Sequence, residues 1–196
     1  MKILNLNVRG LANRVKWRGI RELVVAKKVE MILIQETKLQ TVDALMCGLI
    51  WGDNDFEWKV VPAVNRAGGL LCVWRKDLFV LQNVMVGVGF MGLVGTWGIQ
   101  TQVCAIVNVY SPCNLEEKRR LWAELVAWRH ASPDTSWCVA SDFHAVRCTE
   151  ERKGVAVLPQ GGAEMEEFNR FIDTMEVMDI PLVDRKFTWF RLNDNL

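Results

Sequence analysis

The sequence predicts a layered α/β or α+β domain, on the strength of three observations. The chain opens with a strand, a helix and a second strand, the unit that produces parallel pairing through a crossover. Several β-branched and aromatic runs follow, separated by Gly, Asn and Asp as consecutive strands are. Helical patterns and another apolar strand come later, so helices and strands are interspersed along one chain.

The opening unit spans residues 3 to 36. In residues 3 to 8, Asn5 and Asn7 share one face and apolar residues occupy the other, which predicts a strand. A helix is predicted from residue 14 to 28, where apolar residues recur at Trp17, Ile20, Leu23 and Val24. Residues 31 to 36 form an apolar run that ends at Glu36, which predicts the second strand.

The later elements are predicted in the same way. A short helix is expected over residues 42–51, and strands over residues 58–64, 69–74, 79–86 and 103–110. Asn114 and Glu117 form a capping pair for a helix that carries Leu121, Trp122, Leu125 and Trp128. A strand at 137–142 follows, then a helix with Met165, Phe168, Ile172 and Met175 on one face, and a last strand at 187–190.

Composition narrows the class of protein. A chain of 196 residues with a net charge of +1 is expected to form one domain, without a global field for nucleic acid or membrane. The uncharged, glycine-containing stretch 84–99 is shorter than a spanning helix, so it predicts buried strands joined by turns and no membrane span. The cysteines lack paired spacing and the N-terminus lacks a signal-peptide pattern, which indicates a reduced, intracellular protein.

Polar side chains stand at the carboxyl ends of three apolar strands: Asn7, Glu36 and Asp142. If these strands are neighbours, the three side chains converge at one rim of the sheet. Hard oxygen ligands of this kind suit Mg²⁺ or Mn²⁺, which keeps waters for a phosphate substrate. The alternative interpretation is that acids and amides at strand ends are ordinary helix caps and turn residues.

A family resemblance rests on four motifs. Residues 3–10, 34–38, 109–112 and 141–144 read I-L-N-L-N-V-R-G, I-Q-E-T-K, V-Y-S-P and S-D-F-H. Their order resembles that of the endonuclease/exonuclease/phosphatase superfamily. More narrowly, the chain is similar to the endonuclease domain of plant LINE-class (non-LTR) retroelements, a likeness strengthened by E-R-K-G at 151–154 and F-T-W at 187–189. The resemblance covers essentially the whole chain.

The resemblance implies a two-sheet α/β sandwich with helices outside and metal-dependent hydrolysis of phosphodiester bonds, with DNA as the partner. It assigns Glu36 and Asn7 to Mg²⁺ or Mn²⁺, with Asn7 also at the phosphate. It places Tyr110 beside the scissile phosphate, and Asp142 where the attacking water is oriented or deprotonated. Thr188 falls on a strand expected near the substrate. No obligate protein partner is expected, and a nuclear location fits the resemblance.

Two departures from the family pattern matter. The family has G-D-F-N where this chain has Ser141 and His144. Because His is bulkier and titratable, we expect His144 to weaken catalysis about tenfold to a thousandfold, as loss of one positioned donor does. The rival hypothesis makes His144 a gained metal ligand or general acid. In the family a late aspartate and a Ser-Asp-His segment complete the site; they would follow Leu196, so the single domain 1–196 is expected to be incomplete and to lack its last strands.

The remaining candidates are weaker. Arg14 and the basic residues after it could contact a phosphate backbone, although a solvated helix face explains them better. His130 near the end of its helix is a poor substitute for the family histidine and is expected at the surface. The sequence therefore predicts a phosphodiester hydrolase with little or no activity. The alternatives are a non-catalytic retroelement remnant that binds nucleic acid or protein, and a phosphatase of small molecules.

Overall fold

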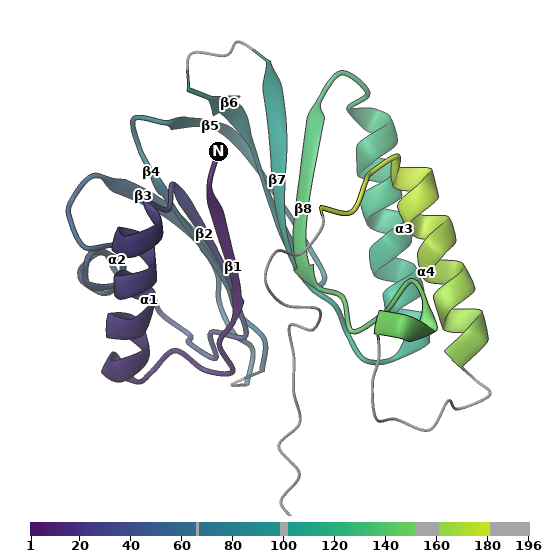
Figure 1. Ribbon diagram of the computed structural model, residues 1–196, viewed down its shortest axis with the longest axis horizontal. Helices are drawn as coiled ribbons and strands as arrows, with labels where there is room; N and C mark the ends of the chain where they lie inside the picture. The colour runs from purple at the N-terminus through teal and green to yellow at the C-terminus, as the bar shows by residue number, and fades with distance from the viewer. Residues whose placement is uncertain (66, 99–101, 152–160, 181–196) are drawn as a thin grey trace, which may run out of the picture.

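Two four-stranded sheets face each other and helices cover their outer surfaces (Figure 1). The computed structural model describes residues 1–65, 67–98, 102–151 and 161–180. The first sheet has the order β1 (Ile3–Asn7), β2 (Met31–Gln35), β4 (Leu70–Arg75) and β3 (Phe56–Val61). The second has the order β5 (Phe79–Gly87), β6 (Phe90–Trp97), β7 (Val103–Tyr110) and β8 (Ser136–Asp142). The predicted two-sheet sandwich is confirmed.

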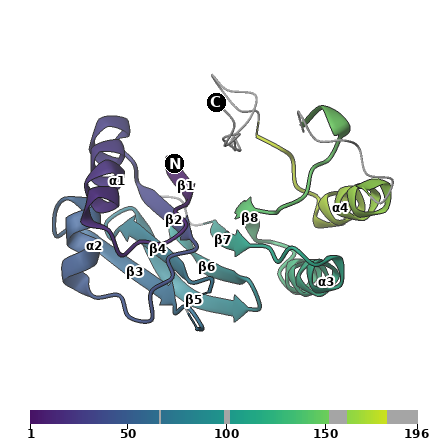
Figure 2. The same ribbon diagram turned by 90° about the horizontal axis from the view of Figure 1, so that it is seen from below.

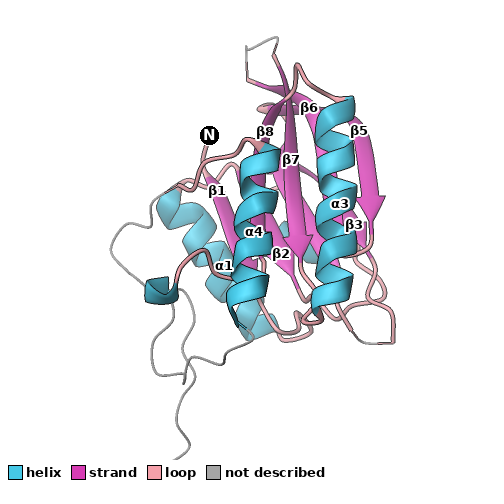
Figure 3. Cartoon of the chain, turned by 90° about the vertical axis from the view of Figure 1, so that its right-hand side faces the viewer, coloured by secondary structure: helices cyan, strands magenta, loops and turns pink. Residues whose placement is uncertain are grey.

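The helices lie on opposite sides of the sandwich (Figure 2). α1 (Arg14–Lys27) and α2 (Ala44–Trp51) cover the first sheet, while α3 (Leu115–Ala131) and α4 (Gly161–Met175) cover the second (Figure 3). A 3₁₀ turn, η1 (Thr149–Glu151), lies between β8 and α4. β1 and β2 are parallel across α1, and β7 and β8 are parallel across α3, whereas the other pairs are antiparallel. The crossover predicted for the start of the chain is therefore present, and a second one joins β7 to β8.

Apolar residues form three layers, one between the sheets and one beneath each pair of helices. The inner layer includes Met31, Leu33, Trp74, Phe79 and Ile106, all 0% exposed. Trp74 meets Phe79 edge to face, with ring centroids 5.8 Å apart. Burying side chains of this size stabilises the fold by about 1.5–3 kcal/mol each, which fixes the two sheets face to face.

Residues 84–97 of the uncharged stretch belong to a β-hairpin made by β5 and β6. One of its glycines, Gly92, is required by packing, because a Cβ atom there would overlap the ring of Trp128 from α3. Because the position is small, the indole can lie directly on the sheet, where it also stacks on Phe90. Across the described residues, no helix has both the length and the apolar character needed to cross a membrane.

Several predicted boundaries need correction. β3 begins at Phe56 and ends at Val61, and Val64 instead pairs with Ala67 in an isolated bridge. Leu23 was expected on the inner face of α1 but is 40% exposed, whereas Leu11 from the preceding loop is fully buried. The predicted strand at residues 187–190 lies outside the described residues.

Candidate active site

Asn7 joins the two sheets at the carboxyl end of β1. Its side-chain Nδ2 donates hydrogen bonds to Glu36 Oε1 at 2.9 Å and to Asp142 Oδ2 at 2.7 Å. Its Oδ1 accepts from the backbone N–H of Arg9 at 3.1 Å. This set of partners fixes the orientation of the amide, because only its nitrogen can face two carboxylates. Asn7 therefore bridges the two acids.

Glu36 reaches the site through a turn that strand alternation does not predict. Alternation places Glu36 on the face of Ile32 and Ile34, and those two residues lie in the layer beneath α1 and α2. The backbone of Glu36 is left-handed, with φ +53°, and the side chain meets Asn7 on the other face. The predicted convergence is correct, but the alternation argument for it is wrong at this residue because the strand has ended.

Glu36 is held as a carboxylate by three neighbours. Partial burial raises its pKa, but hydrogen bonds from Asn7, Lys38 and Tyr110 and the charge of Lys38 outweigh burial, so the pKa is lowered overall. The Lys38 Nζ lies 3.4 Å from Glu36 Oε2, and the glutamate side chain is only 14% exposed. An ionised oxygen donor is thus available at neutral pH.

Asp142 comes from the second sheet, which corrects the expectation of a single rim. It ends β8, and its register partner on the parallel strand β7 is Tyr110, so both side chains stand on the inner face. Burial and the nearby charge of Glu36 raise the pKa of Tyr110 to about 12. The tyrosine hydroxyl therefore keeps its proton at neutral pH and acts as a donor. The site lies where β1 and β8, the edges of two sheets, come together.

His144 forms an ion pair with Asp142. Its Nε2 lies 3.2 Å from Asp142 Oδ2, and its Nδ1 lies 2.8 Å from the backbone oxygen of Ser111. Since both partners are acceptors, both ring nitrogens must donate, which is the hydrogen-bonding pattern of the imidazolium. The hydrogen bond to Asp142 raises the pKa of His144 even though burial opposes it. Conversely, burial raises the pKa of Asp142, but His144 and Asn7 lower it overall.

The histidine occupies a backbone conformation that suits the amide of the family pattern. Residue 144 has φ +49°, in the left-handed region, where Asn, Asp and His are enriched among non-glycine residues. The ring also meets Tyr110 edge to face, with centroids 5.6 Å apart. His144 is therefore accommodated without a forbidden backbone, and its effect on the site is one of charge and size.

Lys118 supports this loop and was missed by sequence reasoning. Its side chain is almost fully buried, and its Nζ donates to the backbone oxygen of His144 at 2.7 Å and to Glu164 of α4. A signal was present, because Lys118 falls at helical spacing with the buried Leu121, Trp122 and Leu125. A single cation on the apolar face of a helix predicts a buried partner.

The other candidates do not meet at the site. Arg14 is exposed at the start of α1, and its guanidinium carbon lies 5.9 Å from the ring of Trp17. Within the described ranges no contact joins Arg14 to Asn7 or Glu36, so its substrate role stays a prediction. Thr188 lies outside the described residues. His130 is exposed near the end of α3, as predicted.

The donor set fits a hard divalent cation held by few protein ligands. Glu36 supplies carboxylate oxygens, and Mg²⁺ commonly takes one or two carboxylates and keeps several waters. Asn7 presents its nitrogen, so to bind a cation through oxygen it would have to give up both hydrogen bonds. Among residues 1–65, 67–98, 102–151 and 161–180, no cluster of three or more His, Cys, Asp or Glu side chains is arranged as a metal site. Glu36 is thus the residue that would hold the metal.

Solved structures with the same fold include several nucleic-acid enzymes. The AP endonuclease LMAP from Leishmania major is 14% identical, with a TM-score of 0.64 over 88% of this chain and 66% of that one. The 3′ phosphatase NExo from Neisseria, solved with a product DNA hairpin, is 16% identical, with a TM-score of 0.68 over 89% and 71%. The endonuclease domain of TRAS1, a telomere-specific non-LTR retrotransposon, is 12% identical, with a TM-score of 0.55 over 88% and 69%.

These similarities establish the fold as an α/β sandwich of the endonuclease/exonuclease/phosphatase type. The chain spans about two thirds of the length of these structures. No family model and no curated protein matches the sequence. At identities of 12–16% the likeness speaks to architecture, so the chemistry has to be argued from the side chains at the site.

Proposed function

We propose that this chain is a divalent-metal-dependent phosphodiesterase of nuclease type, derived from a retroelement endonuclease domain and slow because His144 occupies Asp142. The observation that supports it most is the Asn7 amide, which holds two ionised carboxylates from different sheets within hydrogen-bond distance. Metal-dependent hydrolysis of a phosphodiester needs one carboxylate to hold the metal and another to prepare the attacking water. The fold neighbours that act on DNA favour DNA as the substrate.

Each residue has a distinct task in this proposal. Glu36 would hold Mg²⁺ or Mn²⁺, which would supply positive charge at the phosphoryl oxygens. Asp142 orients a water molecule and takes its proton at a carboxylate oxygen. Tyr110, whose hydroxyl stays protonated, donates to an oxygen of the phosphate. Asn7 keeps the two carboxylates aligned.

His144 opposes this chemistry at Asp142. A carboxylate that accepts from an imidazolium is a poor base, because its pKa is lowered and one oxygen is engaged. The neutral amide of the family pattern carries no charge, so the carboxylate would be more basic, with only the Asn7 hydrogen bond still lowering its pKa. We therefore expect slow turnover in the chain as it stands.

A supercoiled-plasmid nicking assay with Mg²⁺ or Mn²⁺ tests the proposal. The His144→Asn variant should nick DNA measurably, and Glu36→Ala placed on that background should abolish nicking. Glu57→Gln, at an exposed position of β3, is the matched control and should leave the rate unchanged. Failure of His144→Asn to nick with either metal would overturn the proposal, as would nicking that survives Glu36→Ala.

A second candidate function is nucleic-acid or protein binding without turnover. It is favoured by the same ion pair, since both nitrogens of His144 and one oxygen of Asp142 are already engaged. DNA binding that weakens steeply with salt, together with no nicking by any variant, would support this candidate over the enzyme.

A further inference from the structure

Three amide side chains lie directly beneath the site, between the two sheets. Gln35 and Asn108 are 0% exposed, whereas Asn5 is an exposed residue in the middle of the edge strand β1. Each is one or two residues before a site residue, since they precede Glu36, Tyr110 and Asn7 respectively. They lie beside the apolar residues of the inter-sheet layer, such as Leu33, Cys72 and Ile106. We call Asn5, Gln35 and Asn108 the amide layer.

The amide layer links four strands in sequence. Gln35 Nε2 of β2 donates to Asn5 Oδ1 of β1 and to Asn108 Oδ1 of β7, both at 2.6 Å. Asn5 Nδ2 then donates to the backbone oxygen of Ser141 on β8 at 3.3 Å. The parallel pair β1–β2 is thereby hydrogen-bonded to the parallel pair β7–β8, immediately before the residues that carry the site.

Backbone carbonyls fix the direction of these bonds. Asn108 Nδ2 faces the carbonyl oxygens of Ile34 at 3.1 Å and Leu71 at 3.4 Å, so its own oxygen must point to Gln35. Gln35 must then present its nitrogen, and Asn5 must accept from it. At the far end Asn5 presents its nitrogen to another backbone carbonyl. Reversing any one amide would bring two oxygens together, so only one arrangement of the layer satisfies the backbone.

We infer that the amide layer is a positioning element: it sets the separation and register of the two sheets at the Asn7–Asp142 hydrogen bond. Asn7 and Glu36 both come from the first sheet, where β1–β2 pairing and the turn after β2 bring them together. Asn7 and Asp142 belong to different sheets, and apolar contacts between sheets are non-directional. Directional bonds one layer below supply the alignment that apolar packing lacks.

The layer is retained at a cost in stability. Gln35 Oε1 is buried and has no hydrogen-bond partner among the described residues. A buried acceptor without a partner is unfavourable, and an apolar pair of similar shape would avoid it. Polar groups that are retained inside an apolar layer are best explained by the register they specify.

The test replaces both members of the buried Gln35–Asn108 pair rather than one of them. In Gln35→Met with Asn108→Leu both partners become apolar, so the fold should persist with a melting temperature close to that of the parent. The Asn7 side-chain amide is followed by NMR in the full chain without substrate. Its hydrogen exchange should accelerate at least about tenfold, the factor expected when a hydrogen bond to a charged group is weakened.

Val107→Ala is the matched control, because Val107 is the buried neighbour of Asn108 that faces α3 and α4. It should lower the melting temperature and leave Asn7 exchange within about twofold. Unchanged Asn7 exchange in the double variant would overturn the inference, as would equal acceleration in Val107→Ala. The catalytic consequence rests on the proposed function: on the His144→Asn background the double variant should lower kcat about tenfold with KM little changed. If exchange accelerates while no variant nicks DNA, the positioning role stands and the proposed function fails.

Discussion

The site has two halves, one that contains Glu36 from the first sheet and one that contains Asp142 and His144 from the second. Both halves use the same backbone conformation, but with opposite chemical results. Each half places a residue with left-handed φ just after a parallel strand: Glu36 at +53° after β2, and His144 at +49° after β8. In the first half that residue is itself the carboxylate. In the second it is a cation that pairs with the carboxylate two residues before it. The chemistry offered by each half therefore depends on which side chain occupies the turn.

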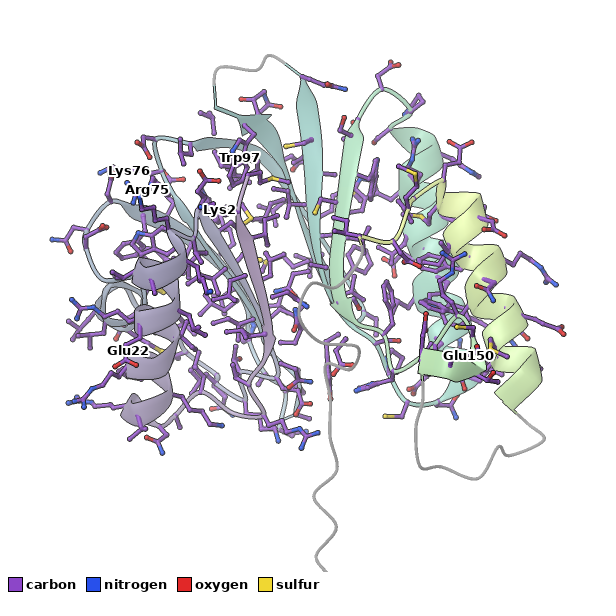
Figure 4. The ribbon with its side chains drawn as sticks, in the orientation of Figure 1. Lys2, Glu22, Arg75, Lys76, Trp97 and Glu150 are labelled. Atoms are coloured by element: carbon purple, nitrogen blue, oxygen red, sulfur yellow. The ribbon has the colours of Figure 1, made fainter. Side chains whose placement is uncertain are left out.

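The halves also differ in how they are held. The loop of Glu36 is tied by backbone bonds, from Gly10 N to Glu36 O at 2.6 Å and from Thr37 N to Gly69 O at 3.1 Å. The loop of His144 is tied by side chains, with Lys118 donating to its backbone oxygen. Backbone bonds survive most substitutions, whereas one change can release a side-chain bond. The Asp142 half is thus the half that mutation should alter most. The carboxyl ends of β1 and β8 point toward the lower part of the sandwich in Figure 1, and Lys2 and Trp97 are labelled at its upper part in the same orientation (Figure 4).

The largest expected effect is the rise in nicking rate when the positive charge of His144 is removed. His144→Asn keeps a residue that tolerates left-handed φ and frees Asp142, so nicking should rise about tenfold to a thousandfold. The rate is measured on supercoiled plasmid under single-turnover conditions with Mg²⁺. His130→Asn, on the exposed end of α3, is the control. A rate that stays at the parental level would mean that the two halves do not differ in the way described.

Next in size is the loss of the buried support for the same loop. Lys118→Met leaves the backbone oxygen of His144 without its donor and Glu164 without its partner. Because Glu164 is partly exposed and can be solvated, we expect a loss of about 2 kcal/mol rather than the larger cost of a fully buried pair. Urea unfolding measures it. Arg119→Met, one residue along α3 on the surface, should change stability little, and a similar loss there would contradict the role given to Lys118.

The ion pair should also make stability depend on pH. The pKa of His144 is raised above 6.5, so its contribution is complete below pH 6.5 and is lost as pH rises through the folded value. The pKa of Asp142 is lowered below 3.8, so its contribution is present above pH 3.8 and lost as pH falls through its folded value. Unfolding free energies of the parent and His144→Asn should therefore differ most between these limits, by about 1 kcal/mol. A difference that is constant from pH 5 to 9 would exclude the ion pair.

The smallest effect is expected on the Glu36 side. Lys38→Met removes the cation beside Glu36 Oε2, so the pKa of Glu36 should rise toward its ordinary value while the group stays ionised at pH 7.5. With less positive charge nearby, Mn²⁺ should bind about two- to fivefold more tightly. The effect is small because the Lys38 side chain is exposed and its charge is screened by solvent. Electron paramagnetic resonance of Mn²⁺ gives the affinity. Lys59→Met on β3 is the control, and unchanged affinity in Lys38→Met would show that Lys38 does not compete for this carboxylate.

Much of the fold was predictable because its signals are local. Alternation placed Asn5 and Asn7 on one face of β1, and helical spacing located α3 and its buried tryptophans. The exposed Leu23 and the displaced bounds of β3 were not predictable, since neighbouring elements decide which side chains are covered. Five of the candidate residues, Asn7, Glu36, Tyr110, Asp142 and His144, do gather in one place, whereas Arg14 lies apart from them.

What the sequence could not reveal is how those residues are joined. Alternation pointed Glu36 the wrong way, because it cannot anticipate a left-handed turn after the last paired residue. Lys118 and the amide layer went unnoticed, since their partners are 26 to 136 residues away along the chain. Contacts across that separation exist only once two sheets have been packed together.

The sequence by itself determined the two carboxylates, the amide between them and the histidine two residues after the second carboxylate, because residue identity and strand ends are local properties. Only the tertiary structure decided that one acid comes from each sheet and that Asn7 donates to both. It also decided that His144 donates one hydrogen bond to the Asp142 carboxylate and another to the backbone oxygen of Ser111. Those facts are geometric: they depend on the meeting of two sheet edges, which no single stretch of sequence encodes.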